Sequence, residues 1–290
     1  MPDSGESFLL PAWSVPFLRD HRADLSHESP FDPYDRRRAW GESTGAGVRV
    51  AVIDSGIDPH HPAVGRVARS VRVERNGDEF AIVEDPEAID IVGHGTACAG
   101  IIRSLAPDVE LISVRVLGAD NKASGVGFAH ALDWVIEQGI QLANLSLSSR
   151  SEELFGTFHE LVDRAYFRNC LLVCSAANTP GQPSYPSLFS SVLSVASHDI
   201  PDPWTFFYNP NPPVEFGAWG VNVPVAWSGG GTMIGSGNSF AAPHITGLAA
   251  LLRGQHPELT TFELKAVLAA TATRVGASAV ASKTSKGDRS

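Results

Sequence analysis

Three residues whose side chains could act together in nucleophilic chemistry stand in short motifs that are far apart in the sequence. Asp54 lies in Val-Ala-Val-Ile-Asp-Ser-Gly, His94 in Gly-His-Gly-Thr, and Ser239 in Gly-Asn-Ser-Phe-Ala-Ala-Pro-His. A serine hydroxyl is a weak nucleophile near neutral pH and needs an adjacent base. An imidazole can take its proton, and a carboxylate can fix the imidazole's tautomer and stabilise the imidazolium. The motifs therefore predict attack by Ser239, with His94 as the base and Asp54 as its partner.

Each of these residues also has an ordinary structural explanation. Asp-Ser-Gly is common turn chemistry, a histidine can be a buried core residue with satisfied hydrogen bonds, and a serine can cap a helix. Taken singly, these explanations compete evenly with a catalytic one. The three motifs together, with their flanking glycines, favour the catalytic interpretation.

The order Asp, His, Ser in these motifs resembles the subtilisin-like serine proteases, or subtilases, which are themselves a known case of this order. The resemblance covers about residues 44–274. It implies a serine endopeptidase that hydrolyses peptide bonds through an acyl-enzyme and requires no cofactor. Two alternatives stay open. One is a dedicated processing peptidase or acyl-transferring enzyme that matures one peptide partner, and the other is a catalytically silent subtilase fold used for binding.

The resemblance also implies where an oxyanion and a peptide would be held. Asn178 matches the subtilase oxyanion-hole asparagine, although an asparagine before Thr-Pro can also simply begin a turn. Asn238 could add a second donor where subtilases usually carry threonine. A polypeptide substrate would bind as an extended strand between two backbone segments. The expected contacts are Ser146, Leu147, Ser148 and Ala176, with Asn121–Ala123 as the second segment.

Several positions depart from the subtilase pattern. Ser-Leu-Ser-Ser at 146–149 replaces Ser-Leu-Gly-Gly, and Ser-Ala-Ala-Asn at 175–178 replaces Ala-Ala-Gly-Asn, which predicts a narrower primary pocket. Phe240 stands where the family has methionine. The inserted loop that carries a tight calcium site in many subtilases is missing after Gly100, and the pair His60–His61 has no matching third ligand. We therefore expect no bound metal.

The composition narrows the class of protein. Of 290 residues, 43% are apolar and 19% are charged, which is typical of a soluble globular protein with a sizeable core. The net charge of −10 argues against nucleic acid or an anionic membrane as a partner. The chain lacks the basic start and the following apolar run of a secretory signal peptide. No stretch reaches the ~18 consecutive apolar residues of a membrane helix. We expect a cytoplasmic protein, or a secreted one if an upstream leader was removed. The sequence does not indicate an oligomeric state.

The three cysteines are expected to be free thiols. Cys170 and Cys174 fall on one predicted strand and would lie about 13 Å apart, beyond the roughly 7 Å between Cα atoms that a disulfide allows. Cys98 follows His94 closely and resembles the thiol found near the active site of some subtilases. A small buried hydrophobic residue is the simpler interpretation of Cys98.

From Gly47 onward, apolar runs rich in Val, Ile and Leu alternate with helix-like runs. Strands that are apolar throughout, separated by helices, predict an α/β protein with three layers, in which helices flank a mostly parallel central sheet. Asp54 then falls at the carboxyl end of the first strand, where such sheets build their sites. The expected strands are 48–53, 111–117, 142–147, 171–175 and 192–196. The expected helices are 96–104, 127–137, 152–167, 239–253 and 261–273.

Three regions are expected along the chain. Residues 1–43 contain several prolines, show no clear period and form an N-terminal extension with a potential regulatory role. Within it, Phe8–Trp13 resembles the apolar, proline-containing stretch with which intracellular subtilisins occupy their own active site. The simpler alternative is that this stretch packs on the domain surface. Residues 44–275 form the subtilisin-like peptidase domain, and 276–290 form a disordered tail.

Overall fold

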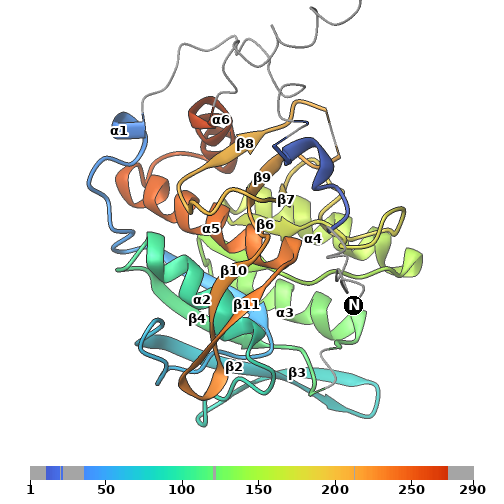
Figure 1. The fold of residues 1–290 in the computed structure, drawn as a ribbon. Helices are drawn as coiled ribbons and strands as arrows, with labels where there is room; N and C mark the ends of the chain where they lie inside the picture. The colour runs from blue at the N-terminus through green and yellow to red at the C-terminus, as the bar shows by residue number, and fades with distance from the viewer. Residues whose placement is uncertain (1–10, 20, 22–35, 120–121, 212, 274–290) are drawn as a thin grey trace, which may run out of the picture.

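The computed structural model describes residues 11–19, 21, 36–119, 122–211 and 213–273. These residues form an α/β fold around a nine-stranded sheet with the order β3-β2-β4-β1-β5-β6-β7-β9-β8 (Figure 1). Seven adjacent strands, β2 to β9 in this order, run parallel, and antiparallel β3 and β8 close the two edges. The strands are β1 (Arg49–Asp54), β2 (Val67–Asn76), β3 (Glu79–Glu84), β4 (Glu110–Arg115), β5 (Leu142–Leu145), β6 (Leu171–Ser175), β7 (Leu193–His198), β8 (Phe206–Tyr208) and β9 (Phe216–Trp219). A separate hairpin consists of β10 (Val223–Trp227) and β11 (Gly231–Gly235).

Helices cover both faces of the sheet. The α-helices are α1 (Arg36–Ala39), α2 (His94–Leu105), α3 (Gly125–Glu137), α4 (Phe155–Phe167), α5 (Asn238–Gln255) and α6 (Thr261–Thr271). Short 3-10 turns are η1 (Val15–Phe17), η3 (Glu152–Leu154) and η4 (Ser228–Gly230). The two faces follow from the alternation of side chains along a strand. In β1, Val50 and Val52 join the core cluster with α2 and α5, whereas Ala51 and Ile53 join the cluster with α3 and α4. The predicted fold class is thereby confirmed.

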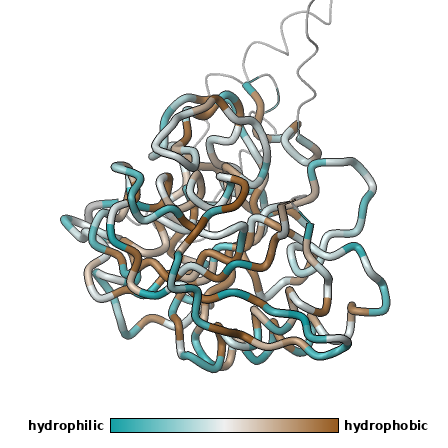
Figure 2. Tube along the Cα trace, turned by 90° about the horizontal axis from the view of Figure 1, so that it is seen from below, coloured by the Kyte–Doolittle hydropathy of each residue, from teal (hydrophilic) through white to brown (hydrophobic). Residues whose placement is uncertain are grey.

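The central strands and the long helices lie where the apolar runs predicted them, with ends shifted by a few residues. The expected helix over 152–167 is η3 followed directly by α4, and the helix expected from position 96 begins at His94. The hairpins β2–β3, β8–β9 and β10–β11 were not predicted. For the β2–β3 hairpin the reason is that β2 carries four charged residues and is only partly buried, so it has no apolar run. Figure 2 shows the hydrophobic stretches mostly inside the molecule and the hydrophilic ones on outer loops.

Part of the N-terminal extension belongs to the packed structure. Phe17 in η1 is fully buried, and Ala39 and Trp40 at the end of α1 lie in the core cluster of α2 and α5. Residues 276–290, expected as a disordered tail, lie outside the described residues, as do residues 8–10 of Phe8–Trp13.

Candidate active site

A groove with a volume of about 810 Å³ lies at the carboxyl ends of β4, β5 and β6. Its lining includes His94, Ser239 and Asn178, which sequence analysis had placed in three separate motifs. All four expected substrate contacts line the same groove: Ser146, Leu147, Ser148 and Ala176. From the second expected segment, Lys122 and Ala123 also line it, while position 121 lies outside the described residues. The structure thus brings the predicted site residues other than Asp54 to one groove.

Behind the groove, His94 forms a hydrogen-bonded pair with Asp54, which does not itself line the groove. The Nδ1 atom of His94 lies 2.9 Å from both carboxylate oxygens of Asp54, which is fully buried at the end of β1. The carboxylate also accepts a hydrogen bond of 2.7 Å from the backbone N–H of Ser55. Because the carboxylate can only accept, we assign the proton of neutral His94 to Nδ1. That tautomer leaves Nε2 as a proton acceptor, as a general base requires.

Two glycines allow α2 to begin this close to β1. Gly93 has φ of 111°, and a Cβ atom there would lie 2.5 Å from the ring of Trp227. A Cβ atom at Gly95 would lie 2.0 Å from the backbone oxygen of Gly56. Any side chain at either position would push the helix start away from Asp54, so Gly-His-Gly is required by packing as well as by chemistry.

The pKa of His94 reflects two opposing effects. Burial disfavours the imidazolium and lowers the pKa, but the charge and hydrogen bond of the Asp54 carboxylate, together with Cys98, outweigh burial and raise the pKa well above the usual 6.5. The pair therefore stabilises the imidazolium that forms when the base takes a proton.

Asp90, which was not among the predicted site residues, holds the start of α2 in place. Its buried carboxylate accepts hydrogen bonds from Val92, Gly93 and Thr96 backbone N–H groups at 2.7–3.0 Å. It also accepts from the hydroxyls of Thr96 and Ser55 at 2.6 and 2.7 Å. An acidic residue just before Gly-His-Gly-Thr, next to the amide groups of a helix N-terminus, was the available signal.

Ser239 lies in the first turn of α5, close to the side chain of Asn178. A Cβ atom built on Gly237 would lie 3.3 Å from the hydroxyl oxygen of Ser239 and 3.7–3.8 Å from the side-chain amide of Asn178. The Oδ1 atom of Asn178 accepts the backbone N–H of Asn238 at 2.9 Å. This bond occupies the acceptor end of the Asn178 amide and leaves its NH₂ group to donate elsewhere.

Further contacts fix the start of α5 beside His94. The hydroxyl of Ser146 donates to the backbone oxygen of Ser239 at 2.8 Å. The ring of Phe240 lies against the ring of His94, with centroids 5.3 Å apart. The residue that replaces the family's methionine therefore packs directly on the base.

Asn238 does not supply a second oxyanion donor. Its side chain is fully buried, and its Nδ2 atom donates to the backbone oxygens of Ala12, Ala177 and Ala176 at 2.8, 3.0 and 3.3 Å. Both N–H groups are thus used on backbone carbonyls. The expectation of a second donor is not supported, because these carbonyls compete for the amide.

The three cysteines are free and buried, as predicted. Cys98 joins Asp54 and His94 in the one group of metal-ligating side chains found among the described residues, with candidate atoms within 4.8 Å of each other. Burial raises the pKa of the Cys98 thiol, which disfavours the thiolate that a metal would bind. The expected absence of a metal stays a prediction. His61 instead lies 2.8 Å from the backbone oxygen of Gly231 through its Nε2 atom.

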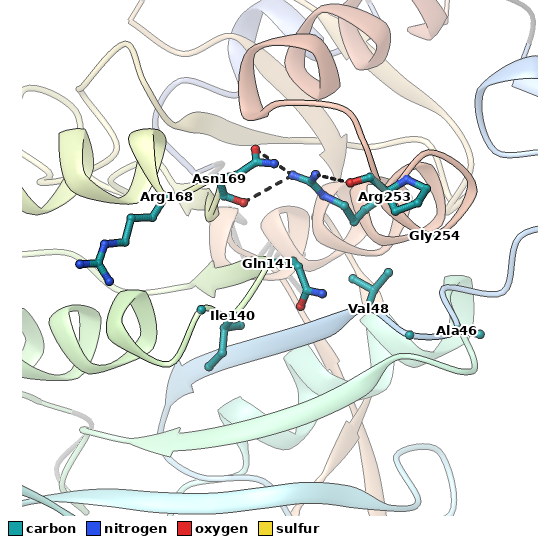
Figure 3. Close-up of a pocket in the computed structure, with 11 residues that line it drawn as sticks. Ala46, Val48, Ile140, Gln141, Arg168, Asn169, Arg253 and Gly254 are labelled. Carbon is teal, nitrogen blue, oxygen red and sulfur yellow. Dashed lines mark hydrogen bonds between the residues drawn. The ribbon is translucent and has the colours of Figure 1, made fainter.

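A second hollow of about 340 Å³ lies near the amino ends of β1, β5 and β6, at the other end of these strands from the groove (Figure 3). Arg253 and Asn169 line it, and the guanidinium of Arg253 binds the backbone and side-chain oxygens of Asn169. No residue of the predicted site lines this hollow.

Within the described part of the chain, no helix combines the length and apolar character needed to cross a membrane.

Comparisons with known proteins agree with this geometry. A profile described as the subtilase family matches residues 45–287. The chain is 34% identical to a thermostable alkaline protease of Halalkalibacterium halodurans over 80% of its own length and 64% of the relative's. It is 33% identical to subtilisin Savinase of Lederbergia lenta over 80% of its length and 86% of the relative's. The fold matches the crystal structure of a cold adapted subtilisin-like serine proteinase with a TM-score of 0.64 and 28% identity, covering 79% of this chain and 83% of that one. This chain belongs to the subtilase family.

Proposed function

We propose that the chain is a serine endopeptidase that hydrolyses peptide bonds through an acyl-enzyme intermediate. One observation carries the proposal, namely that the hydrogen-bonded pair of Asp54 and His94 lies at the groove that Ser239 and Asn178 also line. The names of two relatives, a thermostable alkaline protease and a subtilisin, support the same activity.

Each step of the proposed reaction uses one of these groups. The hydroxyl oxygen of Ser239 attacks the scissile carbonyl carbon, and its proton passes to Nε2 of His94. The NH₂ group of Asn178 stabilises the oxyanion of the tetrahedral intermediate. His94 then returns the proton to the leaving amine as the C–N bond breaks, which leaves an ester on Ser239. Water, deprotonated by His94, hydrolyses this ester by the reverse sequence.

The groove supports an extended polypeptide as the substrate. Its lining includes Ser146, Leu147 and Ser148 from one expected backbone segment, and Lys122 and Ala123 from the other. Ala176 and its neighbours line the groove beyond β6, where serine and alanine replace smaller residues of the family pattern. We propose a preference for small side chains immediately before the cleaved bond, measurable as relative kcat/KM in a peptide series that varies this residue.

Labelling with an active-site fluorophosphonate tests the proposal, together with turnover of a peptide substrate. Labelling and turnover should occur in the native chain and vanish in Ser239→Ala, while Ser236→Ala, an exposed serine nearby in sequence, should retain both. A native chain that is neither labelled nor active, yet binds peptides, would instead support the silent-fold alternative.

The cytoplasmic location expected from the sequence finds no support in the comparisons, since the relatives are subtilisins and alkaline proteases. Secretion therefore stands as the conditional proposal, applicable if a leader precedes residue 1 in the cell. Detecting the protein in the medium or in the cell fraction of its source would decide between the two locations.

A further inference from the structure

Residues 11–18, which precede the matched family domain, lie directly against the candidate oxyanion site. We refer to this segment as the amino-terminal clasp. The backbone N–H of Ala12 donates to the backbone oxygen of Asn178 at 2.8 Å. The backbone oxygen of Ala12 accepts the side-chain N–H of Asn238 at 2.8 Å. One buried residue of the clasp thus joins the candidate oxyanion donor to the residue that precedes Ser239.

Asn238 connects the clasp to the central sheet. Its Oδ1 atom accepts the backbone N–H of Ser197 in β7 at 2.9 Å and the hydroxyl of Ser197 at 3.0 Å. The hydroxyl of Ser14 in the clasp lies 3.4 Å from the same atom. The opposite end of the amide donates to Ala176 and Ala177, which lead from β6 to the oxyanion site. A single buried carboxamide therefore ties β6, β7, α5 and the clasp together.

Phe17 anchors the clasp at its far end. Its side chain is fully buried, and a Cβ atom on Gly217 of β9 would lie 2.3 Å from the Phe17 ring, so the ring packs directly on the backbone of the sheet. The socket residues are Ala176, Ala196, Phe207 and Val214. Because Ala176 belongs both to this socket and to the partners of Asn238, the anchor and the hydrogen bonds act on the same backbone.

We propose that the clasp is a positioning element of the active site. Through Asn238 and the backbone of Asn178, it holds the oxyanion donor at the correct distance from Ser239. None of the described clasp residues lines the groove, so this role differs from occupying the active site. The inference rests on the proposed peptidase activity, because the position of Asn178 matters only if an oxyanion forms.

The test compares the native chain with a shortened chain that begins at Arg19 and therefore lacks the clasp. The quantity compared is kcat per active site. Active sites are counted by fluorophosphonate labelling carried to its end point, so misfolded molecules do not contribute. Removing the clasp should lower kcat per labelled site by about 10- to 100-fold, the range expected when a catalytic group shifts by up to an ångström. KM should change little, and a synthetic peptide of residues 11–18 added in trans should restore kcat.

Point variants keep the test decisive if the shortened chain fails to fold. Asn238→Asp is isosteric but removes the N–H donors to the clasp and to β6, and Phe17→Ala empties the socket; both should lower kcat per labelled site. Val15→Ala, in the same turn but half exposed, should leave it unchanged. A clasp that only stabilises the fold would lower the melting temperature and the labelled fraction while leaving kcat per labelled site intact, and this result would overturn the proposal.

A rise in kcat per labelled site on truncation would overturn the proposal as well, because it would mean that the segment obstructs the groove. Failure of the proposed peptidase activity looks different from either result. In that case the native chain itself would show neither labelling nor turnover.

Discussion

Helices α2 and α5 begin with the candidate base and the candidate nucleophile, yet their first turns are held in different ways. At the start of α2, Asp90 binds the backbone of Val92, Gly93 and Thr96, all within a few residues of His94. At the start of α5, hydrogen bonds come from distant parts of the chain, since Asn238 is bound by partners near positions 12, 177 and 197.

The two helix starts therefore differ in which parts of the chain determine their geometry. We call Asp54, His94 and the start of α2 the histidine half of the site, and Asn178, Ser239 and the start of α5 the serine half. The histidine half consists of the end of β1, the loop that carries Asp90 and the start of α2, all from residues 54–96, with β2 and β3 between them in the chain. The serine half exists only after β6, β7, α5 and residues 11–18 have assembled. We therefore expect changes in the histidine half to act on chemistry or local stability, and changes in the serine half to depend on tertiary packing.

The largest effect is expected from Asp54→Asn in the histidine half. Loss of the carboxylate removes the partner that fixes the tautomer and stabilises the imidazolium, so kcat should fall about 10,000-fold, as in other triads of this type.

Because the base must be neutral, native activity should increase with pH until His94, whose pKa is raised, has lost its proton. The midpoint of this profile should shift to lower pH in the variant, since the largest effect that raises the pKa of His94 is lost while burial still lowers it. Steady-state kinetics across pH, with an unchanged midpoint as the contrary result, tests this assignment.

The same pair has a consequence for stability. A histidine whose pKa is higher in the folded state than in the unfolded state binds its proton more tightly when folded. The stabilisation is fully present below about pH 6.5, the unfolded value, and is lost as the pH rises through the folded pKa of His94. Urea unfolding of the native chain and of Asp54→Asn should therefore differ most on the acid side and converge as the pH rises.

Asn178→Ala should give the next largest effect and should act on the serine half. Turnover is expected to fall roughly 100–1000-fold, the size known for the same donor in subtilisins. Fluorophosphonate labelling should still reach completion, although more slowly, because Ser239 and His94 remain. A variant with native kcat would show that Asn178 is a turn residue, as the Asn-Thr-Pro sequence alone would allow.

Asp90→Asn tests the local support of the histidine half. One carboxylate oxygen becomes an NH₂ group that faces donors, so backbone N–H groups at the start of α2 lose an acceptor. Each such loss costs about 1–3 kcal/mol, and because each carboxylate oxygen accepts at least two hydrogen bonds, we expect the free energy of unfolding to fall by at least that amount. Chemical denaturation measures it, with Asp78→Asn, an exposed aspartate in the turn between β2 and β3, as the comparison. Equal effects in both variants would contradict the role assigned to Asp90.

The sequence predicts features that depend on a short local motif better than features that depend on tertiary packing. Asp54, His94 and Ser239 were recognisable because each lies in a short local motif, and the inner strands because they are apolar on both faces. Asn238 was misassigned, since its partners come together only in the folded chain. Phe17 gave no signal either, because one apolar residue in a proline-rich stretch does not reveal a socket whose residues come from β7, β8 and the segments beside them.

The smallest expected effect concerns the far ends of the two helices, where Arg103 in α2 and Arg253 in α5 each bind the carbonyls of a following Pro-containing turn. Arg103 makes four bonds of 2.7–3.0 Å that use all three nitrogens. Arg253 is more deeply buried, but its Nε atom has no hydrogen-bond partner. A buried unpaired N–H offsets part of what the remaining bonds contribute. Arg103→Met should therefore lower the free energy of unfolding by about 1 kcal/mol more than Arg253→Met. Urea denaturation of both variants measures the difference, and a larger loss in Arg253→Met would show that depth of burial outweighs the number of satisfied donors.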